Sequence, residues 1–191
     1  MLDQSVPYVG FFMKRPAGTA FTPVKLADGF SFALYKHGNE TDWARIETSV
    51  GEFESEFKAM LYFKHYFKSK NELERRCVFI EDENSKKVAT ATAWWHFVEQ
   101  ERRPWLHWVA VDPAYQGLGL GKAITSEVTR IMLDLEGDTD FYLHTQTWSH
   151  KATGIYKKFG YFITDEKILY NGNKENNYKK AIRILENLQR P

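Results

Sequence analysis

The stretch WLHWVAVDPAYQGLGLGKAI, residues 105–124, decides how this chain is interpreted. Its first half, LHWVAV at 106–111, is rich in β-branched and aromatic residues and predicts a strand. Gly117, Gly119 and Gly121 then stand at alternate positions immediately before a helical pattern. A glycine loop between a strand and a helix is typical of a backbone that approaches an anion at the helix N-terminus, although it also makes a tight turn.

Three phosphate-binding templates can be compared with QGLGLGK. The P-loop requires a glycine where Gln116 stands and a hydroxyl residue where Ala123 stands, so this template fails twice. The dinucleotide fingerprint requires Gly-x-Gly-x-x-Gly, and the spacing here does not match it. A third pattern, Gln/Arg-x-x-Gly-x-Gly/Ala between a strand and a helix, is met by Gln116, Gly119 and Gly121. Its physical basis is the set of N–H groups without intrahelical partners that opens a helix.

Composition limits the classes of protein that fit. The 191 residues suit one domain, and 43% hydrophobic with 27% charged residues is typical of a folded globular chain. A formal net charge of +1 gives no electrostatic reason to expect nucleic acid or an anionic membrane as partner. The single cysteine, Cys77, excludes an intrachain disulfide and a zinc site of several cysteines. We therefore expect a cytoplasmic domain without a metal, a signal peptide or a membrane span.

Apolar patterns along the chain predict a mixture of strands and helices. Strands are expected at 29–36, 77–83, 86–98, 106–111, 140–146 and 161–164, and helices at 52–68, 121–136, 149–159 and 176–189, with a short helix from Thr41 or Asp42 to Glu47. Residues 1–28 carry three prolines and are expected to form an irregular arm or a short strand, and 99–104 a polar loop. No repeat or domain boundary is visible, so we predict one α/β (α+β) domain over residues 1–191.

Two segments together resemble the acyl-CoA-binding core of the GCN5-related N-acetyltransferases, the GNAT superfamily. They are LHWVAVDPAYQGLGLGKAI at 106–124 and FYLHTQTWSHKATGIYKKFGYF at 141–162. The second matches the family's "Ala…Tyr-x-x-x-Gly-Phe/Tyr" unit through Ala152, Tyr156, Gly160 and Tyr161. The resemblance is specific over roughly residues 77–162, and it departs from the family at Ser149, where an asparagine is common. Serine can also cap the helix that follows.

The resemblance implies a mixed, mostly antiparallel central sheet flanked by helices, with acetyl-CoA as co-substrate between strands that splay apart at 105–111 and 140–146. It implies that the backbone of Val109 and Val111 pairs with the pantetheine arm, and that an N–H near Val109 points at the thioester oxygen. The pyrophosphate would be held by Gln116, Gly117, Leu118, Gly119, Leu120, Gly121 and Lys122, with Ser149 at the start of the next helix as a further cofactor contact.

Acyl transfer to an amine requires two proton movements. An alkyl amine with a pKa near 10.4 must lose a proton before it attacks, and the departing thiolate must gain one. The resemblance implies that Tyr156 is the acid, although alone it also reads as a core tyrosine. His107 is the leading base, because arylalkylamine N-acetyltransferases have a histidine at the matching place and imidazole titrates in the right range. Alternatively, His107 is a packed core histidine. The base would then be a water relay or one of the less favoured candidates His144, Glu99, Glu101 and His96.

The acceptor is expected to be a primary amine on a small molecule or a peptide. Acidic and aromatic residues near the first two helices and the third strand would suit a cationic or arylalkyl amine. The same tryptophans could instead be core residues, and the same glutamates a solvated helix face. These residues are Trp43, Glu47, Glu52, Glu54, Trp94, Trp95 and Trp105. We predict an N-acetyltransferase. A non-catalytic acyl-CoA-binding module and an acyltransferase with another donor or a hydroxyl acceptor remain open, as does a homodimer.

Overall fold

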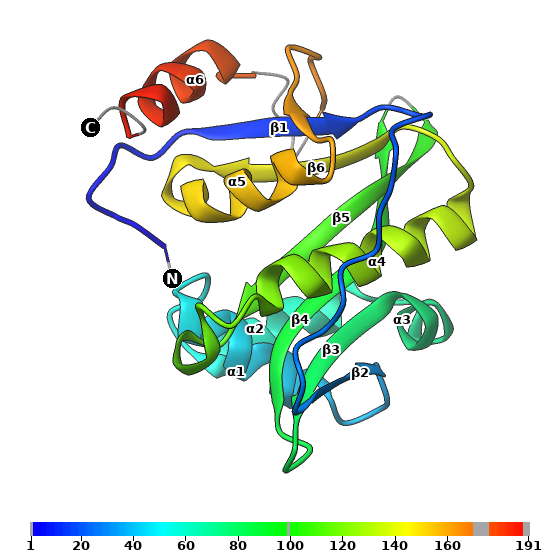
Figure 1. The fold of residues 1–191 in the computed structure, drawn as a ribbon. Helices are drawn as coiled ribbons and strands as arrows, with labels where there is room; N and C mark the ends of the chain where they lie inside the picture. Colours follow the sequence, from blue (N-terminus) through cyan, green and yellow to red (C-terminus); the bar gives the residue numbers. More distant parts are fainter. Residues whose placement is uncertain (1, 99, 170–175, 189–191) are drawn as a thin grey trace. The chain divides into compact units, whose positions relative to one another are not determined.

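The computed structural model describes residues 2–98, 100–169 and 176–188. Its elements follow the chain in an order that mixes strands and helices (Figure 1). They are β1 (Gly10–Arg15), β2 (Phe30–Leu34), α1 (Glu40–Val50), α2 (Glu56–Tyr66), α3 (Lys70–Arg76), β3 (Cys77–Asp82), β4 (Lys87–Val98), β5 (Glu101–Val111), α4 (Leu120–Glu136), β6 (Phe141–Gln146), α5 (His150–Lys158), β7 (Phe162–Ile163) and α6 (Tyr178–Asn187), with 3₁₀ turns at Pro113–Tyr115 and Thr147–Ser149.

The strands of the described residues form one seven-stranded sheet in the order β2-β3-β4-β5-β6-β1-β7. β3 runs antiparallel to β2 and to β4, and β1 runs antiparallel to β6 and to β7. β5 and β6 are parallel, with Trp105 opposite Tyr142. The mixed, mostly antiparallel sheet with helices that the sequence predicts is therefore confirmed.

The chain divides into two compact units. The first comprises Thr22–Ala93 and Leu106–Leu135, and the second comprises Leu2–Phe21, Trp94–Trp105 and the chain from Glu136 onward. The long strands β4 and β5 each contribute residues to both units. Whether residues 1–191 behave as one domain stays a prediction.

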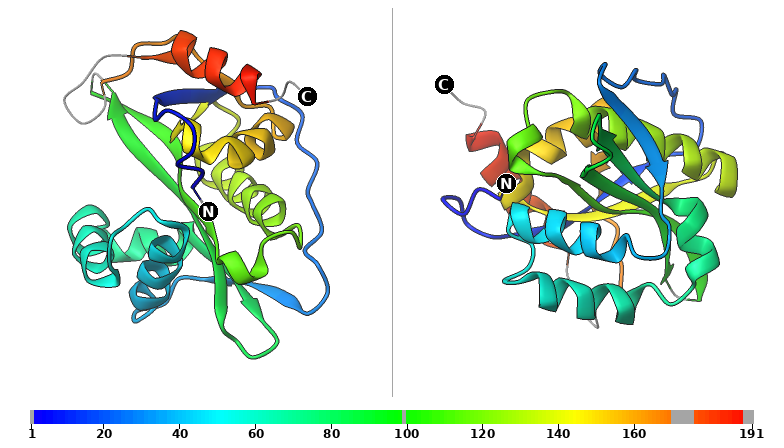
Figure 2. Two further views of the ribbon diagram at one scale, coloured as in Figure 1. Left: turned by 90° about the vertical axis from the view of Figure 1, so that its left-hand side faces the viewer. Right: turned by 90° about the horizontal axis from the view of Figure 1, so that it is seen from below.

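In the first unit, α1 and α2 lie on one face of β3 and β4, and α4 lies on the other (Figure 2). Apolar residues of these elements form the core because their helical or alternate spacing turns them inward. They include Trp43, Ile46, Phe63, Phe79, Ile80, Ile124, Val128 and Met132, all buried. α1 ends at Gly51, whose φ of 95° suits a left-handed C-cap, and α2 begins after Ser55, whose hydroxyl accepts from the Lys58 N–H.

The second unit is held together by the N-terminal strand. β1 lies between β6 and β7, and Phe11 and Met13 on it are fully buried. Arg15, also buried, donates from Nε to the Phe159 carbonyl at 3.1 Å, and so binds the C-terminal end of α5, where a cation is favoured. The arm over residues 1–28 thus contains one short strand, and that strand is internal to the sheet.

Three expectations need correction. Residues 99–104 are not a loop over their described part, since β5 begins at Glu101. The charged residues of this segment made it look like a loop. In the structure the Arg102 guanidinium pairs with Glu136 and covers the Trp95 ring at 4.4 Å, so an extended segment can carry these side chains at the surface. α1 begins after Asn39 rather than at Thr41 or Asp42, and α3 had no predicted counterpart.

Candidate active site

β5 leads directly into the glycine loop within the first unit. Val109 and Val111 are half-buried near the end of the strand, and the Asp112 carboxylate accepts from the Ala114 N–H at 3.0 Å to start the 3₁₀ turn. The Gln116 side chain donates from Nε2 to the Val111 carbonyl at 2.9 Å. The side chain of Gln116 therefore ties the loop back to the strand, which leaves its predicted contribution to phosphate binding to the main chain.

Gly117 and Gly119 have left-handed backbone with open space beside it, whereas Gly121 lies within the first turn of α4. Gly117 and Gly119 have φ values of 87° and 79°, where residues with a Cβ are strained. A Cβ added at either position would meet nothing within 4 Å. None of the described residues would therefore obstruct a ligand that approached the main chain at these two positions.

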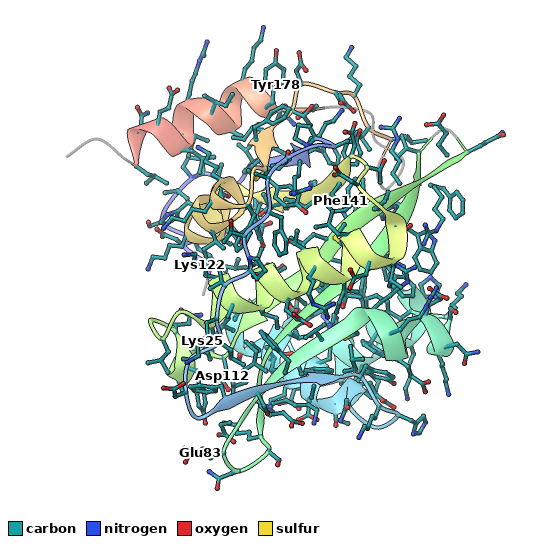
Figure 3. All side chains as sticks on the ribbon, turned by 45° about the vertical axis from the view of Figure 1, so that its right-hand side comes forward. Lys25, Glu83, Asp112, Lys122, Phe141 and Tyr178 are labelled. Atoms are coloured by element: carbon teal, nitrogen blue, oxygen red, sulfur yellow. The ribbon has the colours of Figure 1, made fainter. Side chains whose placement is uncertain are left out.

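The Gly119 carbonyl accepts the N–H groups of Lys122 and Ala123, each at 3.1 Å, and so starts α4, which leaves the helix N–H groups before Lys122 without intrahelical acceptors. Figure 3 labels Asp112, just after β5, and Lys122, exposed in the first turn of α4, which bracket the loop in sequence. A main-chain donor set at a helix N-terminus, with a lysine beside it, fits a pyrophosphate.

Trp108 interrupts β5 between the predicted base and the predicted thioester donor. Its φ is 51°, in the left-handed region that a bulky aromatic residue rarely adopts. Such a residue breaks strand alternation and re-aims its neighbours, as β-bulges near active sites do. The ring is held by Phe53 at 5.3 Å and by Trp43 at 5.4 Å. Nothing in the composition of LHWVAV signals this distortion.

His107 is almost buried, with 6% of its surface exposed, and it contacts α2. Its Nε2 lies 3.0 Å from the Tyr66 hydroxyl. The sequence singled out His107 but missed Tyr66, because the helical periodicity of 52–68 draws attention to its apolar residues and gives no reason to select one tyrosine.

The residues proposed for acceptor recognition are largely core. Trp43 and Trp105 are fully buried, and Trp94 nearly so. Glu47 is 1% exposed, and burial, with a smaller effect of the Glu52 carboxylate, raises its pKa well above the usual range. The Glu54 carboxylate pairs with Lys58 at the surface. The core interpretation of Trp43 and Glu47 is the one that the structure supports.

Tyr156 and Ser149 belong to the second unit. Tyr156 is buried on α5 at 7% exposure, with the Tyr161 ring 6.2 Å away. Ser149 is the N-cap residue of α5, but its hydroxyl makes no capping hydrogen bond, so serine does not replace asparagine in that role. Gly160 ends the helix segment with a φ of 85°, and a Cβ there would come within 2.3 Å of Thr19 Cγ2.

Three of the alternative candidates for the base, His144, His96 and Glu101, lie in the second unit. Burial lowers the pKa of His144 to about 4, with a further contribution from His96, and burial lowers the pKa of His96 as well. Both imidazoles are therefore neutral at pH 7. Glu101 is exposed at the start of β5, and Glu99 lies outside the described residues.

Comparison with known proteins names the family. A model of the acetyltransferase (GNAT) family matches residues 41–161, more than half of the chain. The chain belongs to this GNAT acetyltransferase family. Membership confirms the resemblance drawn from the two sequence segments, and the family is one of acetyltransferases, the class of enzyme that the sequence predicts.

Solved GNAT structures share the fold. A GCN5-related N-acetyltransferase from Sphaerobacter thermophilus has a TM-score of 0.65 and 18% identity, over 83% of this chain and 49% of its own. A GNAT-family acetyltransferase from Colwellia psychrerythraea has a TM-score of 0.60 and 14% identity, over 83% and 54%. An uncharacterised protein from Mycobacterium leprae is 36% identical over 56 residues, which are 29% of this chain and 14% of that protein.

The chain thus spans about half the length of the solved GNAT structures that it matches. At these identities the solved structures show the fold alone. In the part of the chain that the structure describes, none of the helices has the length and apolar character needed to cross a membrane.

Proposed function

We propose that the chain is an N-acetyltransferase that moves an acetyl group from acetyl-CoA to a primary amine by direct attack. The observation that carries this proposal is the open glycine loop at the start of α4. Gly117 and Gly119 combine left-handed backbone with free space, which suits a ligand that approaches the main chain. Gly137, after α4, is equally open, and what sets Gly117 and Gly119 apart is their place immediately before the N-terminus of α4, where unpaired N–H groups can meet an anion.

On the donor side, the residues from Gln116 to Lys122 hold the pyrophosphate in this proposal. Main-chain N–H groups of the loop and of the first turn of α4 supply the donors, and Lys122 adds positive charge. Ser149, at the start of α5, remains a candidate contact through its main chain, since its side chain makes no cap.

The distorted part of β5 supports the predicted role of its valines. In the proposal, Val109 and Val111 pair with the pantetheine arm as a neighbouring strand would. The left-handed Trp108 turns the peptide groups next to it, which makes the Val109 N–H a candidate donor to the thioester oxygen. A donor of this kind typically lowers the barrier by about 2.7–4 kcal/mol.

Two protein groups handle the protons. Acyl transfer forms a C–N bond as the C–S bond breaks; the amine loses a proton and the thiolate gains one. We assign the acid to Tyr156, whose burial suits delivery of a proton away from bulk water, and the base to His107. The amine is on a small molecule or a peptide, and a cytoplasmic location suits an enzyme supplied with acetyl-CoA.

Two measurements test this function. Acetyl-CoA should raise the unfolding midpoint, because a ligand that binds only the folded state stabilises it by RT ln(1 + [L]/Kd). An amine and peptide panel with free-thiol detection should find an acceptor, and Tyr156→Phe should lower kcat by about 10²–10⁴. Tyr161→Phe is the matched control, since it removes a neighbouring buried hydroxyl that has no hydrogen-bond partner among the described residues.

The alternative is a module that binds acyl-CoA without catalysis. It predicts the same stabilisation by acetyl-CoA but no transfer to any amine. Absence of both stabilisation and transfer would overturn the proposed function altogether, and transfer to a hydroxyl acceptor would overturn the assignment of the amine.

A further inference from the structure

Tyr66 and His107 form a pair that links α2 to β5 in the first unit. The Tyr66 hydroxyl lies 3.0 Å from His107 Nε2, and the two ring centroids are 5.4 Å apart. His107 is nearly buried, whereas Tyr66 is only half-buried. The Tyr66 side chain is therefore more accessible to solvent than the His107 side chain.

The phenol is held in place by other aromatic rings. Tyr66 stacks on Tyr62 with centroids 5.3 Å apart and an interplanar angle of 13°, and Phe67 meets it edge-on at 5.0 Å. Tyr62 in turn packs against Trp108 at 5.0 Å, next to His107 on β5. A side chain packed against two other rings is pre-organised for one hydrogen bond, which a proton transfer requires.

We propose that Tyr66 is the outer member of a two-residue proton relay, with His107 as its inner member. The inference rests on the proposed acyl transfer and identifies the group that touches the amine. Nε2 carries no proton at the start and accepts the Tyr66 O–H. When the substrate ammonium gives a proton to Tyr66 Oη, the hydroxyl proton moves to Nε2. The products are a neutral amine, a neutral tyrosine and an imidazolium, so charge and protons balance.

The two groups need each other for this chemistry. A phenol with a pKa near 10 is a poor base unless it passes its own proton on, and His107 can receive that proton near pH 7. His107 alone is too enclosed to meet the amine. About one alkyl amine in 2,500 is neutral at pH 7, so a group that removes the proton at the site has a large effect on the rate.

Kinetics over a range of pH test the relay. We expect Tyr66→Phe and His107→Gln each to lower kcat/KM by about 10²–10⁴ at pH 7. The double variant should lose little more than the worse single one, because the two residues act as a unit. The loss in Tyr66→Phe should shrink as the pH rises toward the pKa of the amine, where the substrate is already neutral. A purely structural role would lower the rate equally at every pH.

The matched control is Tyr62→Phe, which removes a hydroxyl one turn earlier on α2 and keeps the stacked ring. Rates of Tyr66→Phe within threefold of wild type at pH 7, or losses that simply multiply in the double variant, would overturn the relay. The proposed function would survive such a result if wild-type protein still bound acetyl-CoA and transferred acetyl groups.

A second readout does not depend on an acceptor. ¹⁵N NMR of the His107 imidazole should report a hydrogen-bonded, unprotonated Nε2 in wild-type protein, and that signal should shift in Tyr66→Phe but not in Tyr62→Phe. An Nε2 that carries the proton in the free enzyme, or no shift in Tyr66→Phe, would overturn the relay even if no amine substrate were found. A wild-type protein with neither acetyl-CoA binding nor transfer would instead overturn the proposed function.

Discussion

Gly119 and Gly160 have nearly the same backbone conformation and opposite surroundings. Both have positive φ, 79° and 85°. A Cβ at Gly119 would meet nothing within 4 Å, whereas a Cβ at Gly160 would come within 2.3 Å of Thr19 Cγ2. Gly119 starts α4 beside open space, and Gly160 follows α5 where the N-terminal segment packs against it. Conformation alone therefore does not distinguish a glycine that packs against its neighbours from one that lies open, but the neighbourhood does.

The two sequence segments that resemble the family therefore contain glycines with different roles. Gly160 stands four residues after Tyr156, so it is easily read as part of the active site. The structure gives it a packing role beside Arg15, which binds the Phe159 carbonyl just before it. Gly119 has no such internal role. Substitutions at the two positions should therefore affect different properties.

The largest effect is expected for Gly160→Ala. Left-handed strain and the overlap with Thr19 should together destabilise the protein by about 2–5 kcal/mol, measured by urea unfolding. Thr19→Ser removes the overlapping Cγ2 and keeps the hydroxyl that donates to the Pro16 carbonyl. The double variant should recover the overlap part of the loss. A Gly160→Ala protein as stable as wild type would remove the contrast between the two glycines.

Acid should weaken the unit that contains Gly160. Burial and His96 lower the pKa of His144 to about 4 from the ordinary imidazole value of 6.5, so the unfolded chain takes up the proton first. The free energy of unfolding is unaffected above pH 6.5 and falls as the pH drops from 6.5 to about 4, by roughly 2–3 kcal/mol from this group.

Unfolding midpoints measured across that range should follow this course. His144→Gln should flatten most of the fall, leaving the smaller contribution of His96. An unchanged slope in this variant would show that another group governs the acid response.

A smaller effect is expected for Glu47→Gln in the unit that contains the glycine loop. Burial raises the pKa of Glu47, so its contribution to stability is present below the unfolded pKa and is lost as the pH rises through the folded pKa. The amide cannot ionise, and the variant should be more stable than wild type at alkaline pH by about 1 kcal/mol or more.

Acetyl-CoA affinity should not change in this variant, since Glu47 is a core residue. A weaker affinity would return Glu47 to the binding site.

Much of the fold could be predicted from the chain because hydrophobic period is local. The helix from Leu120 and the hairpin of β3 and β4 come from patterns a few residues long. The extension of β5 back to Glu101 could not be predicted, because Arg102 is accommodated by Trp95 and Glu136 from other elements. α3 is short and mostly charged, so its sequence carries little periodicity.

The features of the candidate site that could be predicted are those that follow from residue type and spacing along the chain. The left-handed glycines follow from their residue type and spacing. Trp108 and Tyr66 do not, since the φ of Trp108 depends on rings from α1 and the following loop, and Tyr66 matters only through its contact with His107. Both depend on contacts between elements that are distant in sequence, which a linear motif does not record.

Calorimetric titration of acetyl-CoA into Gly119→Ala and Gly137→Ala tests the central claim most directly. Gly137, just after α4, has a φ of 75° and, like Gly119, nothing within 4 Å of an added Cβ. Both variants should lose about 1–2 kcal/mol of stability from left-handed strain. Acetyl-CoA should bind Gly119→Ala roughly 10- to 100-fold more weakly than wild type and Gly137→Ala with wild-type affinity. Equal affinities in all three proteins would contradict the assignment of the loop to the pyrophosphate.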